Sequence, residues 1–155
     1  MERAQKQLGQ ILIERKLISP QRLEEAVSEQ KRTKEFLGAV LLRLGFIKEK
    51  ELMAALSEQF NIPVTGLKNK YIDWSFVKTF SPSLILDHKC FPVEKDNTSI
   101  TVAITDPLDA WALKKAEEES RGMKLKLVLV SADDMQDAIQ RYKEYVHRNI
   151  SNLFK

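Results

Sequence analysis

Side chains that commonly perform chemistry are scarce in this sequence of 155 residues. The single cysteine, Cys90, lies two positions from His88, and the only other histidine is His147. A zinc site needs three or four ligands of this kind. A nucleophile–base pair of Cys90 with a histidine also lacks a third group in view to orient the base. We therefore predict a surface histidine beside a small buried thiol, with no metal site and no catalytic residue.

The glycines do not form a phosphate-binding loop either. They lie at positions 9, 38, 45, 66 and 122, a spacing that cannot build the pattern Gly-x-x-x-x-Gly-Lys. Carboxylates are plentiful, but most fall on helix faces that we expect to be solvated, as in the run 117–119. We therefore expect that the isolated chain is not an enzyme and needs no cofactor for catalysis.

Charge and composition exclude several further classes. The net charge of +3 is spread thinly over both halves of the chain, so no large phosphate-backbone footprint is indicated. A single cysteine permits no internal disulfide. The N-terminus is too polar for a signal peptide, and no apolar run approaches the roughly 18 residues of a membrane span. We expect a cytoplasmic protein without direct membrane insertion, which reaches a membrane only through a partner.

The elements that would position any site begin with an internal repeat. When the sequence is shifted by 29 positions, residues 1–60 match themselves without a gap, which predicts two copies of one supersecondary unit. The matching pairs include Leu8-Gly9 with Leu37-Gly38, Leu12 with Leu41, Leu23 with Leu52, and Ser28-Glu29-Gln30 with Ser57-Glu58-Gln59. Apolar residues spaced three and four apart predict helix, turn, helix in each copy. Ser19 fits an N-cap followed by Pro20, and Gly45 fits a left-handed helix end.

After Phe60 the pattern changes to short helices and strands. We predict helices capped by Asp73 and Ser81, a hairpin of 92–94 with 99–104, and a helix that opens at Asp106-Pro107 and closes at Gly122. A strand at 125–130 and an amphipathic helix follow, the helix starting with a capping box of Ser131 and Asp134. The predicted fold class is α+β: tandem helix-turn-helix repeats at 1–60, packed with a small α/β subdomain at 61–147. Residues 148–155 would be a tail or linker.

The repeat, together with the segment Ala103-Ile104-Thr105-Asp106-Pro107-Leu108-Asp109, resembles a known family. It is similar to the N-terminal, MshEN-type domain of type II secretion and type IV pilus assembly ATPases, from about Leu8 to Tyr142. The resemblance implies a regulatory or docking domain that couples the motor to the cytoplasmic domain of an inner-membrane platform protein, at the periphery of that membrane. The ATPase core would be a further partner if the chain is part of a longer protein, and its phosphate loop is absent here.

In a subset of the family, the resemblance implies binding of cyclic di-GMP through the two motifs. A glycine at a helix start lets backbone N–H groups approach a phosphate, leucines offer apolar contact to a purine, and glutamines can bond a base or sugar edge. Carried over position by position, the candidate ligand-binding residues are Leu8, Gly9, Leu12, Leu23, Val27, Gln30, Leu37, Gly38, Leu41, Leu52, Leu56 and Gln59.

Several positions depart from the family pattern and leave alternatives open. The position before Leu-Gly, where binders favour a basic residue, holds Gln7 in one copy and Phe36 in the other, and Lys16 stands where the second copy has Gly45. Lysines such as Lys6 and Lys34 are near, but lysine lacks the planar fork of arginine. In the structural alternative the leucines form core stripes, the glycines permit close helix packing, and the glutamines cap or bridge the repeats. A helix-turn-helix nucleic-acid binder is disfavoured by the balanced charge.

Overall fold

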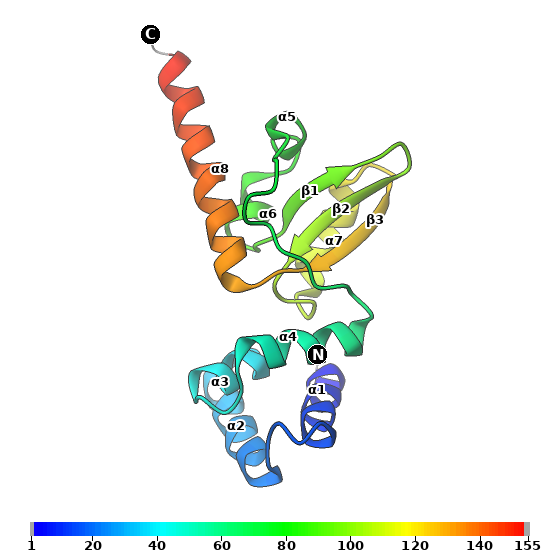
Figure 1. Cartoon of the computed structure of the whole chain (residues 1–155), viewed down its shortest axis with the longest axis vertical. Helices are drawn as coiled ribbons and strands as arrows, with labels where there is room; N and C mark the ends of the chain where they lie inside the picture. The colour runs from blue at the N-terminus through cyan, green and yellow to red at the C-terminus, as the bar shows by residue number, and fades with distance from the viewer. Residues whose placement is uncertain (1, 154–155) are drawn as a thin grey trace. The chain divides into compact units, whose positions relative to one another are not determined.

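The chain folds into two compact units, Met1–Ile62 and Pro63–Lys155. The computed structural model describes the backbone of residues 2–153 and the side chains of residues 3, 4 and 6–150. Helices dominate, and the strands form a small sheet in the second unit (Figure 1). The fold class is therefore α+β, as the sequence predicts.

The first unit consists of four helices, two from each repeat. These are α1 (Glu2–Glu14), α2 (Pro20–Thr33), α3 (Leu37–Arg43) and α4 (Glu49–Phe60). α1 packs against α4, and α2 packs against α3, so each copy of the repeat contacts the other. The apolar stripes meet in a core in which Leu8, Leu12 and Leu41 are fully buried.

The ends of these helices follow from local chemistry. The Ser19 side chain accepts a hydrogen bond from the Arg22 N–H (3.2 Å), and Pro20 occupies the first turn, where its missing N–H costs nothing. Gly45 has a φ of +74°, and its counterpart in the first repeat, Lys16, has a φ of +59°. Both turns thus contain a residue in the left-handed backbone conformation, which glycine adopts without steric cost and lysine does not.

The second unit is built on a three-stranded sheet in the order β1-β2-β3. β1 (Phe91–Lys95) and β2 (Ser99–Ile104) form the predicted antiparallel hairpin, and β3 (Lys124–Leu129) runs parallel to β2. Val64 forms a parallel bridge with Leu129 and so continues the sheet at one edge. The helices of this unit are α5 (Trp74–Val77), α6 (Pro82–Leu86), α7 (Ala110–Glu119) and α8 (Ala132–Leu153).

Asp73 and Ser81 cap α5 and α6 as predicted, but α7 begins later than expected. Asp109, rather than Asp106, accepts the capping bond from the Ala112 N–H (3.0 Å). Asp106 accepts from the Leu108 N–H (2.8 Å) and thereby forms a separate turn before the helix. The first of two nearby aspartates therefore shapes the turn, and the second caps the helix.

α8 differs from its prediction at both ends. Ser131 accepts from the Asp134 N–H (3.1 Å), but the Asp134 carboxylate does not complete a capping box; it accepts from the Leu67 N–H instead (2.7 Å). The helix continues to Leu153, so the segment predicted as a tail or linker from residue 148 is helical up to that point. Residues 154 and 155 lie outside the described part.

Candidate functional site

The first repeat of unit Met1–Ile62 contains an open groove of about 460 Å³. We call it the first-repeat groove. Its lining residues come from α1, from α2 and the turn after it, and from the start of α3: Lys6, Gly9, Leu23, Val27, Gln30, Lys31, Lys34 and Leu37. Five of the twelve sequence-predicted ligand residues thus come together around one space: Gly9, Leu23, Val27, Gln30 and Leu37.

Gly9 allows the second helix of the repeat to approach the first closely. A Cβ atom at this position would lie 3.0 and 3.1 Å from the two δ carbons of Leu23. These distances are short for a carbon–carbon contact, so a Cβ at position 9 would displace the Leu23 side chain by a few tenths of an ångström. The wall of the groove is therefore formed by backbone at Gly9 and by the half-buried side chains of Leu23 and Val27.

Three lysines give the groove its charge. Lys6, Lys31 and Lys34 line it and are exposed, so their ammonium groups can reach an anion held there. Lys34 is the left-handed C-cap of α2, with its N–H donating to the Gln30 carbonyl (2.8 Å). Lys31 is a groove residue that sequence reasoning missed, although its place directly after Gln30 puts it in the same helical turn. An apolar wall with three cations suits a ligand that is both flat and anionic.

The equivalent region of the second repeat has a different character. Phe36 precedes Leu37-Gly38, and a Cβ on Gly38 would lie 2.6 Å from the Phe36 Cε1 atom and 3.0 Å from the δ carbons of Leu52. The ring therefore covers the face of Gly38. The counterparts of Lys6 and Lys31 at a shift of 29 are Glu35 and Phe60, so the basic residues of the first repeat are absent from the second.

The remaining predicted ligand residues are buried in the first unit or connect its helices. Leu8, Leu12, Leu41 and Leu56 are at most 1% exposed, and Gly38 and Leu52 are also buried. The Gln59 Nε2 atom donates to the Ala4 carbonyl (2.8 Å), which bridges α4 to α1. The two glutamines of the repeat are thus unequal: Gln59 joins helices, whereas Gln30 faces the groove.

Ion pairs hold the side of the unit formed by α2 and α3. Arg43 contacts Glu35 (2.7 Å) and Glu29 (3.2 Å), and Glu29 also pairs with Arg32. The bond from Arg32 holds the pKa of Glu29 below its ordinary value, and the bond from Arg43 does the same for Glu35. Both carboxyl side chains are partly exposed, 24% for Glu29 and 36% for Glu35, so solvent weakens the ion pairs and the network orients α2 and α3 more than it stabilises the unit.

The second unit places the sequence-predicted histidine and cysteine in different surroundings. Cys90 is buried, and burial raises the pKa of its thiol to about 12, with a further contribution from nearby carboxylates. His88 lies partly exposed, with its Nδ1 atom 3.1 Å from Asp109 Oδ2 and its ring against Trp111. Among the described side chains, no group of three or more His, Cys, Asp or Glu residues is arranged to hold a metal ion.

Comparison with known proteins identifies the family. The MshEN domain family matches residues 60–149, more than half of the chain. The chain is also 30% identical over 135 residues to the type IV pilus assembly ATPase PilB of Myxococcus xanthus, which covers 87% of this chain and 24% of PilB. The chain therefore belongs to the MshEN domain family. It spans about a quarter of that relative, and the matched family is a domain distinct from an ATPase catalytic core.

Other relatives and solved structures extend this picture. Bacteriophage adsorption protein B of Escherichia coli is 27% identical, over 83% of this chain and 17% of its own length. The solved structure of MshE with cdg (cyclic di-GMP) has a TM-score of 0.79 and 26% identity, and the match covers 87% of this chain and 97% of that one. The N-terminal domain of XpsE, at 21% identity with a TM-score of 0.72, has the same fold over 89% of this chain and 94% of its own.

No helix in the described part of the chain is both long enough and apolar enough to span a membrane.

Proposed function

We propose that this chain is a regulatory and docking domain of a type IV pilus or type II secretion assembly ATPase. In this role it couples the motor to the cytoplasmic domain of an inner-membrane platform protein. The observation that carries the proposal is the match to PilB, a pilus assembly ATPase, over 87% of the chain. Two compact units in a segment of this size fit a module that can bind a partner and a ligand separately.

The docking role is tested by binding to the platform. We expect the full chain to capture the purified cytoplasmic domain of a pilus or secretion platform protein in a pull-down, and to hydrolyse no ATP by itself. An unrelated cytoplasmic domain is the necessary control for non-specific capture. Absence of binding to every platform domain tested would contradict the proposal.

A second candidate function is binding of cyclic di-GMP, which the first-repeat groove favours. The groove offers an apolar wall, the Gln30 amide for a base or sugar edge, and three lysines for phosphate. Its volume of about 460 Å³ falls in the lower part of the range of roughly 300–1,000 Å³ typical of small-molecule pockets. The similarity to MshE, whose solved structure contains cyclic di-GMP, supports this candidate.

The two repeats would contribute unequally to such a site. Lys6, Lys31 and Lys34 replace the charge that Gln7 cannot supply, whereas Phe36 covers Gly38 in the second repeat. We infer that one half of the two-fold nucleotide would contact the groove and that the other half would find fewer polar partners. Affinity would then be weaker than in a domain with two open, basic repeats.

Isothermal titration calorimetry with cyclic di-GMP tests this candidate. Replacing Lys31 and Lys34 by glutamate should weaken binding at least about tenfold, because a charge-assisted hydrogen bond contributes about 1.5–3 kcal/mol. Gln7→Arg should strengthen binding, since its guanidinium can donate two parallel bonds to guanine. The matched control is Lys48→Glu with Lys50→Glu, two exposed lysines at the start of α4. No heat from the wild-type chain at high micromolar nucleotide would exclude this function.

A further inference from the structure

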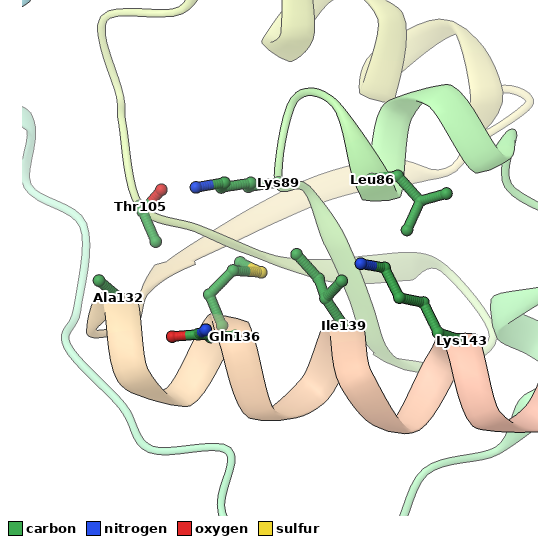
Figure 2. A pocket seen from close by; sticks show the side chains of 8 residues that line it. Leu86, Lys89, Thr105, Ala132, Gln136, Ile139 and Lys143 are labelled. Carbon is green, nitrogen blue, oxygen red and sulfur yellow. The ribbon is translucent and has the colours of Figure 1, made fainter.

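A second groove, in unit Pro63–Lys155, runs along α8 and belongs to none of the sites described above. We call it the α8 groove. Its volume is about 360 Å³, and Figure 2 shows the side chains that line it: Leu86, Lys89, Thr105, Ala132, Met135, Gln136, Ile139 and Lys143. α8 supplies one wall, and the other comes from the end of α6, the turn before β1 and the residue after β2.

The α8 groove has an apolar floor and a polar rim. Leu86, Met135 and Ile139 form the floor; Met135 and Ile139 are anchored in the core and expose only a small part of each side chain. Thr105 and Gln136 contribute a hydroxyl and an amide to the rim. In Figure 2 the Lys89 ammonium points toward Thr105, and the Lys143 ammonium lies over Ile139 and Leu86. The ammonium groups of Lys89 and Lys143 therefore lie at different positions along the same apolar floor.

The positive charge of this rim is not balanced by neighbouring acids. Among the side chains described for residues 3, 4 and 6–150, neither Lys89 nor Lys143 has a carboxylate within ion-pair distance. The closest acids in sequence are engaged elsewhere: Asp87, two residues before Lys89, accepts from the Ser83 hydroxyl (3.2 Å), and Glu144, directly after Lys143, accepts from the Gln140 amide (3.4 Å). Lys89 has a φ of +53°, so the turn that carries it has a defined left-handed shape. The rim thus keeps a local excess of positive charge.

We propose that the α8 groove binds a short acidic peptide segment of a partner protein, anchored by one aliphatic side chain on the floor. Charge complementarity to Lys89 and Lys143 selects an acidic occupant, and the aliphatic floor selects its apolar anchor. No lining residue is aromatic, so the groove offers a nucleobase no stacking surface. From Ala132 to Lys143 the helix rises about 16 Å, which matches about five residues of an extended peptide.

Peptide binding by the α8 groove is inferred from the geometry and charge of the groove. The identity of the partner, in contrast, rests on the proposed docking function. In that function the acidic segment belongs to the cytoplasmic domain of the platform protein. Two experiments separate these claims, because one uses a defined peptide and the other uses the platform domain.

The first experiment follows the amide NMR signals of the full chain during titration with an acetylated, amidated hexapeptide. This peptide has two central leucines, with one Glu-Asp pair on each side. We expect shifts in the signals of Leu86, Met135 and Ile139, and at least tenfold weaker binding when the acids are replaced by Gln and Asn. Lys89→Glu with Lys143→Glu should weaken binding at least tenfold as well. The matched control, Lys114→Glu with Lys126→Glu, should leave it within about twofold.

Shifts centred on another surface, equal binding of the neutral peptide, or no shift at about 5 mM peptide would overturn the α8 groove as an acidic-peptide site. Both lysine pairs consist of exposed residues, so loss of folding is not expected in either variant. Circular dichroism of each variant checks this before the titration.

The second experiment measures binding of the platform domain to four proteins: the full chain, the two double variants of the first experiment, and a variant that combines all four substitutions. If the Lys89→Glu, Lys143→Glu chain binds at least tenfold more weakly while the control does not, the groove is the docking site. If both variants bind the platform domain like the unaltered chain, docking uses another surface and the occupant of the α8 groove is not a segment of the platform protein. If the unaltered chain binds the peptide but no platform domain, the groove stands and the docking function fails.

Discussion

Gly9 and Gly38 occupy equivalent positions in the two repeats, but their surroundings differ. At Gly9 the three atoms nearest to a Cβ would all belong to the flexible, half-buried side chain of Leu23. At Gly38 it would meet the Phe36 ring at 2.6 Å and the buried Leu52 at 3.0 Å. The same residue type therefore leaves a groove open in one repeat and accommodates an aromatic ring in the other.

Substitution by alanine should reveal this difference. We expect Gly38→Ala to lower the free energy of unfolding by about 1–3 kcal/mol, because overpacking in a filled region costs this much. Gly9→Ala should change it by less than about 1 kcal/mol, since the gain in helix propensity offsets a small movement of Leu23. Urea unfolding of the two variants measures both values. Equal stability of the two variants would show that Phe36 does not constrain Gly38.

Asp96 illustrates a single carboxylate with a measurable pH signature. Its carboxylate accepts bonds from the N–H groups of Thr98 and Ser99 (2.8 Å each) and from the Ser99 hydroxyl (2.9 Å) in the hairpin turn. These bonds lower the pKa of Asp96 to about 2. The folded state thus favours the ionised form, so its contribution to stability is complete above the ordinary pKa of about 4 and is lost as the pH falls toward 2.

Asp96→Asn should therefore lower the melting temperature of the second unit at pH 6. The difference from the unaltered chain should shrink between pH 4 and pH 2, where the native aspartate becomes protonated. Thermal unfolding followed by circular dichroism at several pH values measures it. Asp137→Asn, at an exposed position of α8, controls for loss of charge, and a difference that stays constant down to pH 2 would contradict the assignment.

At the scale of elements, the start of α8 joins two distant segments. Asp133 and Asp134 both lie in its first turn, where negative charge is favourable. Only Asp134 reaches the Leu67 N–H, at 2.7 Å, and so fastens the 63–72 segment to the helix. Val64 is joined to the sheet in the same segment through its bridge with Leu129. The segment is therefore held by the strand bridge, by the Asp134 carboxylate and by the Arg141 side chain, which donates to the Lys70 carbonyl (3.3 Å).

Asp134→Ala should destabilise the second unit by about 1–2 kcal/mol, because it leaves the Leu67 N–H without its charged acceptor. Asp133→Ala is the matched control, since it removes the same charge from the same helical turn without touching Leu67. Hydrogen exchange of the Leu67 amide should accelerate in Asp134→Ala and remain unchanged in the control. Equal effects of the two substitutions would mean that the helix dipole, rather than the tie to Leu67, accounts for the loss.

At the scale of the whole chain, each unit has a core of its own. The first buries apolar side chains of all four helices, among them Leu8, Ala26, Leu41 and Leu56, and the second buries Phe91, Val102 and Met135. Each therefore has the apolar interior that independent folding requires. The two repeats supply the first core only together, because α1 packs on α4 and α2 on α3.

We expect fragments 1–62 and 63–155 each to fold separately. The 1–62 fragment should be helical but less stable than the 63–155 fragment, because a domain of about 60 residues buries a smaller share of its surface. Circular dichroism and NMR spectra of the two fragments measure this. An unfolded 1–62 fragment would show that the division at residue 62 does not separate two folding units.

The sequence could predict the elements because their signals are local. Each signal involves residues only a few positions apart, so it can be recognised without knowledge of the tertiary structure. These signals are the apolar spacing, the caps at Ser19, Asp73 and Ser81, and the left-handed Gly45. The exceptions also have a local cause: Asp106 and Asp109 are both good caps, and the sequence does not show which one the chain path uses. The repeat and the segment 103–109 indicated the family for the same reason, since both are visible in the sequence alone, and the family match itself falls on residues 60–149.

The site depended on what the tertiary structure brings together. Lys6 comes from α1 and Lys31 from α2, and only the packing of these helices places both beside Gly9. The same packing decides the different roles of the two glutamines: Gln59 bridges α4 to α1, and Gln30 faces the groove. The sequence by itself thus determined the helices, the strands and the family, because local bonds and periodicity specify them. Only the tertiary structure decided which repeat is open and which is filled, because contacts between distant side chains depend on the path of the whole chain.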